Sequence, residues 1–493
     1  MPAIDRPNVL ILMGDEHPVF MSGCYGHRSV RTPTLDGLAA RGVVFDAAYC
    51  PSPICAPSRA AMMTGRHVHT VQVWDNAAPL RCDWPTFAHS FSAAGYRTIL
   101  CGKMHFVGPD QLHGFGERWT QDIYPATFDW TRSNRRETAV NDGQNIDRVF
   151  EAGEGWTRDM DYDEEVVFRA EYGLRRIARQ RERPPFMMCV SLTGPHYPYR
   201  APSRYWNMYC DDDVDLPVIP DDYRDRDHVY VDWLRRHGKF DRLVPDEVCI
   251  RARRAILGRI TMVDDYLRRI LSLLRREGLE RDTIVVYASD HGDMMGEHGL
   301  WYKNAAYEWS SRSPWLMAGP GVAPRRIDEA VSLLDLGPTL CGLAGVTPIY
   351  DRTDGRDLSD LLRGEREPGT GQAIMENYGE GVWRGWRMIR QGQHKMTYVP
   401  GYEPELYDLA ADPDEWRDVA GDPAYAKVRA DLERAVLSDW DPDLCDEMRW
   451  RSEERRLAIL SAGQSLDWQM PSAPVPHPLR PEQGGRIDNV SAQ

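Results

Sequence analysis

Four apolar runs, each followed directly by polar residues, are the feature that most restricts the fold of this sequence. They cover residues 8–13, 97–101, 186–192 and 283–288. Short, continuously apolar runs of this kind are typical of buried parallel strands. Helical patterns lie between them, with apolar residues at spacings of three and four over 256–274 and a second helix expected over 164–183. This alternation predicts an α/β fold with a large, mainly parallel sheet covered by helices on both faces.

The pattern changes after residue 365. Strand-like runs at 386–389 and 394–399 are separated by a Gln-Gly turn signal, and residues 405–409 are a further strand candidate. Residues 470–493 are too rich in Pro and Gly to build a core alone, so we expect an arm that lies on another subunit of a homo-oligomer, a dimer or tetramer. The predicted parts are an α/β domain at 1–365, a smaller C-terminal α+β domain at 366–440, and a helix with an extended tail at 441–493.

The charge balance limits the classes of partner. The 493-residue chain has a formal net charge of −15, which argues against nucleic acid, because phosphate binding needs a clustered basic face. A few buried Arg and Lys residues can still form a positive pocket for an anionic substrate. The first apolar run is too short for a secretion signal, and no stretch approaches the ~18–20 apolar residues of a membrane span. We therefore expect a cytoplasmic protein without a membrane partner.

The polar residues that follow the apolar runs can bind metals or transfer protons. Because the carboxyl ends of parallel strands meet at one edge of a sheet, we expect these residues to form a site there. The strongest single motif is CAPSR at 55–59, followed by a predicted helix over 60–66. A group at a helix N-terminus faces unpaired N–H donors and the positive end of the helix dipole, which suits an oxyanion.

CAPSR resembles the C-x-P-x-R signature of formylglycine-dependent sulfatases, which belong to the alkaline phosphatase superfamily. The resemblance extends over nearly the whole chain, through GKMH at 102–105, GPHYPY at 194–199, SDHGDMMGEHGLWYK at 289–303 and DLGPT at 335–339. Within that family the sequence is most similar to choline sulfatases. The longer motifs that carry this similarity are VWDNAA at 73–78, GKMHFVGPDQLHGF at 102–115 and DIYPATFDWT at 122–131.

The resemblance implies one divalent metal ion, bound by Asp15, Asp290, His291 and an oxygen of the modified Cys55. Carboxylate oxygens favour calcium, magnesium or manganese, and the imidazole shifts the preference somewhat toward manganese. Many sulfatases have a second Asp and an Asn where this chain has Glu16 and His291. Choline sulfatases and phosphonate monoester hydrolases share this departure. The choice between calcium and manganese stays open.

The resemblance also implies that Cys55 is oxidised to formylglycine by a formylglycine-generating enzyme. A serine nucleophile would form a sulfate ester that is hard to break. In a hydrated aldehyde, one hydroxyl attacks sulfur and the other then expels sulfate by re-forming the carbonyl. The implied reaction is the hydrolysis of a sulfate monoester.

Positive and proton-transferring side chains complete the implied catalytic set. Arg59 and Lys103 would hold the nucleophile and the sulfate oxygens. Lys303 and His196 would face the ester oxygen, with His196 as the general acid. His105 would act as the base when sulfate leaves.

The same resemblance places three residues around the substrate. Asn76 would donate a hydrogen bond to the sulfate, Trp130 would offer an aromatic face to a quaternary ammonium, and Glu380 would supply a carboxylate. Choline sulfatases add a histidine from the segment after the DWT motif, but this chain has none between residues 131 and 163. The arginines of that segment could instead bind a second anionic group; they are Arg132, Arg135 and Arg136.

Three functions stay open at this point. The first is hydrolysis of a small alkyl sulfate such as choline sulfate, and the second is a promiscuous arylsulfatase, phosphonate monoester hydrolase or phosphodiesterase with the same machinery. The third is a catalytically silent binding protein in which Cys55 is never converted. Asp293, Glu297 and His298, within the motif at 289–303, are assigned a structural role in orienting loops and metal ligands.

Overall fold

A computed structural model describes residues 6–131, 140–141, 143–350 and 352–462 of the chain. An eight-stranded sheet forms its centre, with the strand order β11-β2-β10-β9-β1-β7-β4-β5. The neighbours β9, β1, β7 and β4 run parallel. They correspond to the four predicted apolar runs: β1 (Asn8–Asp15), β4 (Arg97–Gly102), β7 (Phe186–Pro195) and β9 (Thr283–Ser289).

The remaining strands of this sheet are short. They are β2 (Val43–Phe45), β5 (Glu117–Arg118), β10 (Trp315–Ala318) and β11 (Arg325–Ile327). Only β10 runs against its neighbours β2 and β9, so the sheet is mixed but mainly parallel, as predicted. Two small parallel pairs lie outside it, β3 (Ala48–Tyr49) with β12 (Val331–Ser332) and β6 (Gly153–Glu154) with β8 (Arg200–Ala201).

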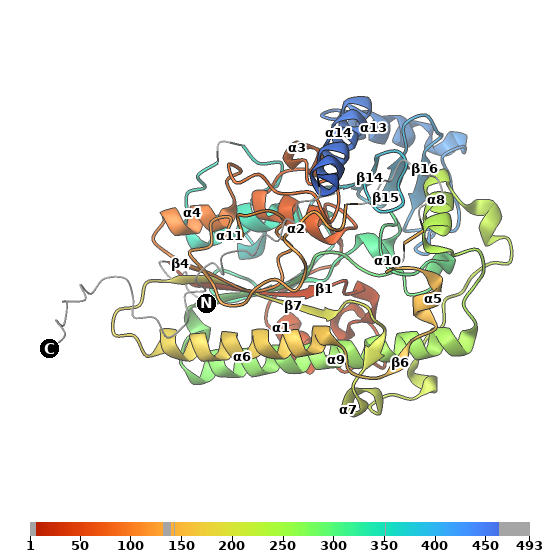
Figure 1. The fold of residues 1–493 in the computed structure, drawn as a ribbon. Coiled ribbons are helices and arrows are strands. Elements are labelled where there is room, and N and C mark those ends of the chain that lie inside the picture. Colours follow the sequence, from red (N-terminus) through yellow and green to blue (C-terminus); the bar gives the residue numbers. More distant parts are fainter. Residues whose placement is uncertain (1–5, 132–139, 142, 351, 463–493) are drawn as a thin grey trace.

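Helices cover both faces of the sheet (Figure 1). On one face lie α1 (Pro33–Ala40), α6 (Arg158–Ala178) and α9 (Asp246–Arg276); on the other lie α2 (Cys55–Thr64), α4 (Phe87–Ala93) and α11 (Leu336–Ala344). Side chains of β1 alternate between the two faces: Val9 and Ile11 belong to one core cluster, Leu10 and Leu12 to the other. The two-sided covering predicted from the apolar strands is confirmed.

The helix predicted over 164–183 lies earlier in the chain, because α6 begins at Arg158 and ends at Ala178. Asp159 and Asp161 lie in its first turn, where acidic groups are favoured by the helix dipole. The shorter helices are α3 (Val68–Val71), α5 (Ile146–Val149), α7 (Ser203–Trp206), α8 (Val229–Gly238), α10 (Glu308–Ser311) and α12 (Ser359–Arg363).

A smaller α+β unit follows in the chain, as predicted. Its antiparallel sheet consists of β13 (Gln372–Asn377), β14 (Trp386–Gln391), β15 (His394–Tyr398) and β16 (Glu405–Asp408). Helix α13 (Ala426–Val436) packs on this sheet, with Leu432 and Val436 in a core shared with Ile389 and Met396. Helix α14 (Pro442–Ser461) comes last. The boundaries at 365/366 and 440/441 stay predictions, and residues 463–493, with the whole of the proposed arm, lie outside the described part.

The parallel strands bring the polar residues that follow them to one edge. Asp15, the last residue of β1, pairs with Pro195 at the end of β7, and Gly14 pairs with Ser289 at the end of β9. The backbone N–H of Lys103, directly after β4, donates to the carbonyl of Ser191 in β7 at 3.0 Å. The candidate residues therefore meet where the four strands end.

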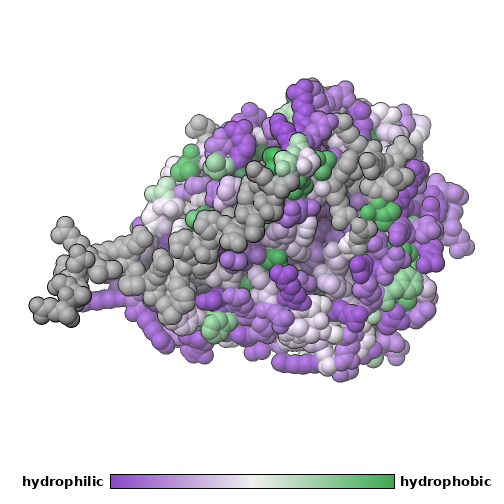
Figure 2. Space-filling view, viewed as in Figure 1, coloured by the Kyte–Doolittle hydropathy of each residue, from purple (hydrophilic) through white to green (hydrophobic). Residues whose placement is uncertain are grey.

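Among the described residues, no helix combines the length and the apolar character that a membrane crossing would require. The face of the molecule in Figure 2 is mostly hydrophilic, and its apolar residues form small separate spots.

Two glycine-to-alanine substitutions in helices test the packing around the sheet. A Cβ at Gly173, in α6, would lie 2.0 Å from a ring carbon of Trp119, whereas a Cβ at Gly37, in α1, meets nothing within 4 Å. We expect Gly173→Ala to destabilise the fold by about 1–3 kcal/mol through overpacking. Gly37→Ala should be neutral or stabilise by about 0.5–1 kcal/mol through helix propensity. Thermal unfolding midpoints would measure both, and a midpoint of Gly173→Ala at or above that of the wild type would contradict this packing.

Candidate active site

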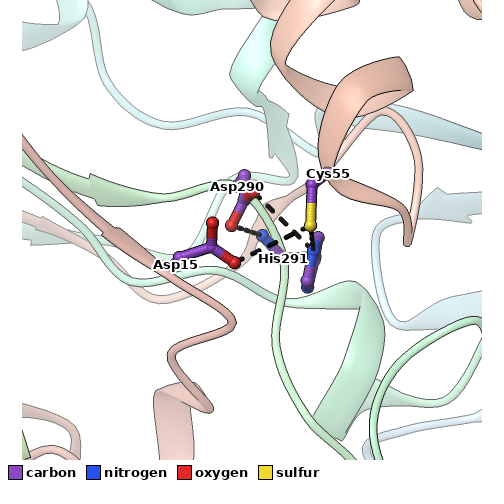
Figure 3. A group of neighbouring side chains, drawn as sticks. All are labelled: Asp15, Cys55, Asp290 and His291. Atoms are coloured by element: carbon purple, nitrogen blue, oxygen red, sulfur yellow. Dashed lines mark hydrogen bonds and ion pairs between the residues drawn. The ribbon is translucent and has the colours of Figure 1, made fainter. Parts of the chain in front are cut away.

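Four buried side chains converge at the carboxyl ends of the central strands (Figure 3). Ligand-type atoms of Asp15, Cys55, Asp290 and His291 all lie within 4.8 Å of one another. The Sγ atom of Cys55 lies 3.2 Å from Nε2 of His291 and 3.7 Å from Oδ1 of Asp15. Asp15 ends β1, Cys55 begins α2, and the other two residues follow β9. The structure thus brings together the four residues that the sequence predicts as metal ligands.

The donor set suits a hard divalent cation. Two carboxylates and one imidazole match the oxygen-rich sites of calcium, magnesium and manganese. All three side chains are buried, and their positions at the strand ends place them near one another. Asp15, Asp290, His291 and the group at position 55 would hold the ion.

A fully buried guanidinium connects the two aspartates. Arg59 lies 3.0 Å from Oδ2 of Asp15 and donates from Nε to Oδ2 of Asp290 at 2.8 Å. It also donates to the carbonyl of Lys103 and to Oγ of Ser191, both at 2.9 Å. The Lys103 ammonium forms a second ion pair with Asp15. Burial and the neighbouring Cys55 would raise the pKa of Asp15, but Lys103, His196 and Arg59 lower it to about 2.

The environment of Cys55 favours an anion. Burial alone would raise the pKa of the thiol, but Lys103, Lys303 and His291 hold it well below its ordinary value. The Lys303 ammonium lies 3.1 Å from Sγ. The helix predicted over 60–66 is longer than expected, because α2 begins at Cys55 itself. Pro57 allows this early start, since it lies in the first turn, where its missing N–H is not needed.

A buried glutamate orients the candidate acid. Nδ1 of His196 donates to the carbonyl of Tyr197 at 2.6 Å, and its Nε2 lies 3.0 Å from Oε2 of Glu16 and 3.2 Å from Nζ of Lys303. Nζ of Lys303 also lies 2.9 Å from Glu16. Burial opposes protonation of His196, but Glu16 raises the pKa of the imidazole above its ordinary value. The sequence showed Glu16 only as a replacement for an aspartate, so its contacts with His196 and Lys303 were not predicted.

His105 lies in a backbone conformation that non-glycine residues rarely adopt, with φ of +61°. The buried Asp122 fixes this turn, because its Oδ2 accepts from the backbone N–H groups of Met104 and His105 at 2.9 and 2.8 Å. The imidazole lies against the ring of Tyr124, with 4.9 Å between centroids, and lines the same cavity as Cys55. This position agrees with the predicted site, and its role as a base stays a prediction.

A cavity of about 280 Å³ opens from Cys55 toward the three predicted substrate residues. Asn76, Trp130 and Glu380 all line it. Oδ1 of Asn76 accepts from the N–H of Ala56 in the first turn of α2 at 3.0 Å, and its Nδ2 donates to Glu380. The Asn76 amide therefore connects the first turn of α2 with Glu380 on the opposite side of the cavity. Its contact with sulfate stays a prediction.

Burial raises the pKa of Glu380 to about 7. The negative charges of Cys55 and Asp75 also raise this pKa, whereas the ammonium of Lys303 lowers it. Trp130 is 41% exposed and packs against Tyr124 at a tilted angle of 56°, with 4.8 Å between ring centroids. The arginines at 132, 135 and 136, considered as an anion site, lie outside the described residues.

Sequence reasoning missed several residues of this cavity wall: Asp75, Tyr124, Asn141, Gln144, Tyr197 and His237. His237 comes from α8 and packs against residue 381, where a Cβ would lie 2.7 Å from its Cγ. The segment at 131–163 offers no histidine, but the fold supplies one from elsewhere. No local motif marks His237, whereas Tyr124 lies within the recognised motif at 122–131.

Asp293, Glu297 and His298 make contacts that fit their predicted structural role. Oδ2 of Asp293 accepts from the hydroxyl of Tyr199 at 2.9 Å, and Glu297 pairs with Arg253. His298 stacks on Tyr307 with 3.7 Å between ring centroids.

Comparison with known proteins agrees with this geometry. The family model described as "Sulfatase" matches residues 7–346, more than half of the chain. The chain belongs to the sulfatase family. A second model, "N-sulphoglucosamine sulphohydrolase, C-terminal", matches residues 296–440 of this sulfatase. The resemblance inferred from the sequence motifs is confirmed, and the protein is a hydrolase of sulfuric esters.

Individual relatives cover nearly the whole sulfatase. A choline-sulfatase from Rhizobium meliloti is 37% identical over 478 residues, covering 93% of this chain and 91% of the relative. An arylsulfatase from Clostridium perfringens is 27% identical over 466 residues, covering 88% and 94%. The crystal structure of a phosphonate monoester hydrolase of Agrobacterium radiobacter superposes with a TM-score of 0.71 at 25% identity, covering 91% of this chain and 96% of the other.

We expect Asp290→Asn to weaken the binding of Ca²⁺ and Mn²⁺ by more than ~10-fold, the loss that is typical even of residues that only orient ligands. Asp265→Asn is the matched control, because this carboxylate lies on α9 and pairs with Arg204 and Arg268 instead. Equilibrium dialysis followed by metal analysis would measure both variants. Equal affinity of Asp290→Asn and wild type would remove Asp290 from the ligand set.

Proposed function

We propose that this sulfatase hydrolyses small, cationic alkyl sulfate monoesters such as choline sulfate, with formylglycine formed from Cys55 as the nucleophile. The main support is a single cavity that is lined by Cys55 and also by aromatic and acidic side chains, among them Trp130 and Glu380. The proposal includes one divalent ion, calcium or manganese, at Asp15, Asp290 and His291, and a formylglycine-generating enzyme as partner. A cytoplasmic location and a homo-oligomeric state, dimer or tetramer, stay predictions.

The proposed groups divide the chemistry between them. The metal would supply Lewis acidity, and the hydrated aldehyde would supply one hydroxyl for attack and a second that allows sulfate to be released. Arg59 and Lys103 hold the aspartates and direct positive charge toward position 55, where the sulfate oxygens would lie. Lys303 adds positive charge at 3.1 Å from Sγ of Cys55.

His196 is the proposed proton donor to the departing oxygen. Its Nδ1 proton is engaged with a backbone carbonyl, so Nε2 is the nitrogen that faces Glu16, Lys303 and the cavity. Glu16 favours the protonated ring, which keeps a proton available where the leaving alkoxide needs it. His105 lies in the cavity wall near Tyr124 and is the proposed base for sulfate release.

The far wall of the cavity supports a cationic head group. Trp130, Tyr124 and Tyr197 offer aromatic faces, and Glu380 and Asp75 add carboxylates. A quaternary ammonium is attracted by both features. The similarity to a choline-sulfatase supports the same substrate class.

The second candidate is a broader aryl sulfatase, phosphonate monoester hydrolase or phosphodiesterase. The 41% exposure of Trp130 favours this second candidate, because a cavity that is open to solvent at Trp130 admits larger ester groups. The structural similarity to a phosphonate monoester hydrolase also supports it. The third possibility, a silent binding protein, has less support because every proposed catalytic side chain lies at the cavity or in the ion-pair network beside it.

A substrate panel would test the proposal on protein whose Cys55 conversion is verified by a loss of about 18 mass units from its peptide. The panel contains choline sulfate, its neutral isostere 3,3-dimethylbutyl sulfate, 4-nitrophenyl sulfate and a phenyl phosphonate monoester. We expect kcat/KM for choline sulfate to exceed that for the isostere by ~10-fold or more, because cation–π contacts contribute about 0.5–2 kcal/mol and Glu380 adds charge attraction. Cys55→Ala should fold normally and lose turnover.

Each other outcome of the panel has a distinct meaning. Equal values for choline sulfate and its isostere would reject the cationic head group. A higher kcat/KM for the phosphonate ester would favour the second candidate. Near-wild-type turnover by Cys55→Ala would reject Cys55 as the nucleophile.

His196→Ala should lower kcat for an alkyl sulfate by ~10²–10⁴-fold, the usual contribution of general acid catalysis. It should affect 4-nitrophenyl sulfate much less, since nitrophenolate leaves without a proton. Steady-state rates on the two esters measure the difference. His394→Ala, in β15 of the smaller sheet, is the control and should leave both rates unchanged. Equal losses on the two esters would show that His196 is not the proton donor.

A further inference from the structure

We propose that Arg449 and Arg456, both on α14, are positioning residues that fix the substrate end of the cavity. The two family models end at residues 346 and 440, so α14 lies beyond both of them. The inference rests on the proposed function, because it takes Asn76, Trp130 and Glu380 as the residues that surround the substrate.

Arg449 holds the segment that carries Glu380. Its Nη1 donates to the carbonyls of Tyr378 and Val382, the latter at 3.1 Å, and its Nη2 donates to the carbonyl of Trp383 at 2.6 Å. These carbonyls lie on both sides of Glu380, whose φ of +49° is in the left-handed region. A single planar guanidinium thus closes the loop that presents the carboxylate.

Arg456 holds the two segments that carry Asn76 and Trp130. Its Nη1 and Nη2 form a two-point ion pair with Asp75, at 2.8 and 2.7 Å, and Asp75 directly precedes Asn76. Nη1 also donates to Oγ1 of Thr131 at 3.1 Å, and Thr131 directly follows Trp130. Segments that lie more than 50 residues apart in the sequence are therefore connected by one side chain.

The composition of the buried face of α14 supports a positioning role. Its buried residues are Cys445, Arg449, Glu453 and Arg456, so three of the four are charged. A helix that only covered a core would bury apolar residues on this face. Burying a charge costs several kcal/mol unless it is paired, and an apolar replacement is often as stable. The charged residues on this face therefore do not add stability that apolar residues could not provide. Their role is to make specific contacts with the neighbouring loops.

Neither arginine contacts the catalytic group. The described contacts of Arg449 and Arg456 do not include Asp15, Cys55, Asp290 or His291. Loss of either arginine should therefore loosen the site of the ester head group and leave the sulfate site intact. The two ends of the substrate can be measured separately, because inorganic sulfate occupies only one of them.

The experiment compares Arg449→Met with Arg455→Met in the full-length, converted enzyme. Arg455 lies on the exposed side of the same helix and is the matched control. We expect Arg449→Met to raise KM for choline sulfate and for 4-nitrophenyl sulfate by tenfold or more, with the inhibition constant of inorganic sulfate changed less than twofold. Arg455→Met should match the wild type. Arg449→Lys keeps the charge but cannot reach three carbonyls, so we expect an intermediate rise in KM.

Amide hydrogen exchange of residues 378–385 gives a readout that does not need turnover. The N–H groups of Gly379 and Gly385 are hydrogen-bonded to the side chains of Asn377 and Asp446, and Asp446 pairs with Arg449. We expect their exchange to be at least tenfold faster in Arg449→Met. If that variant does not fold, Arg449→Lys supports the same measurements.

The proposal is overturned if the exchange of residues 378–385 stays at the wild-type rate, or if KM and the sulfate inhibition constant rise by the same factor. Failure of the proposed function would look different: the converted wild-type enzyme would hydrolyse neither ester, or it would not prefer choline sulfate to its neutral isostere. In that case the exchange rates still decide whether Arg449 positions the Glu380 segment.

Discussion

A buried ion-pair network of two aspartates and two basic side chains is the constraint on which the rest of the structure depends. Arg59 bridges Asp15 and Asp290, and Lys103 pairs with Asp15, with all four side chains removed from water. Breaking such a pair by removing one partner typically costs about 3–5 kcal/mol, because the remaining charge is left buried. The four residues come from the ends of β1, β4 and β9 and from α2. The network therefore closes only when the strands are in register and α2 is docked, so correct folding and a complete site require each other.

The network also explains why the site suits an oxyanion. Asp15 and Asp290 compensate Arg59 and Lys103, and Glu16 compensates part of the charge of Lys303 and His196. At position 55, however, the surrounding cations outweigh the acids, as the lowered pKa of the Cys55 thiol shows. A low-dielectric setting strengthens this effect, since few water molecules screen the charges. The same field that stabilises a thiolate at position 55 would attract the negatively charged oxygens of a sulfate ester.

The sequence predicted the central strands and the residues at their ends because both signals are local. A buried parallel strand is a continuous apolar run, and its last residues face one edge of the sheet, so Asp15, Lys103, His196 and Asp290 could be placed without knowing a single contact. The short strands β2, β10 and β11 have only three or four residues and no period of their own, and their pairing depends on tertiary contacts. His237 reaches the cavity from α8 through long-range packing, which no local pattern encodes.

The catalytic centre and the substrate end are built in different ways, and this difference explains how one family can accept different esters. The proposed catalytic side chains lie at or directly after strand ends of the central sheet, on α2, or on the loops beside them, and the strand register and buried ion pairs there tolerate little change. Asn76, Trp130 and Glu380, the proposed head-group residues, lie on loops, which tolerate change better and often determine specificity. In this chain those loops are held by two arginines of α14 that do not touch the ion-pair network. A change in α14 or in these loops would therefore alter the ester that fits and leave the charge arrangement around position 55 as it is. Such a division is consistent with the similarity of one fold to a choline-sulfatase, an arylsulfatase and a phosphonate monoester hydrolase.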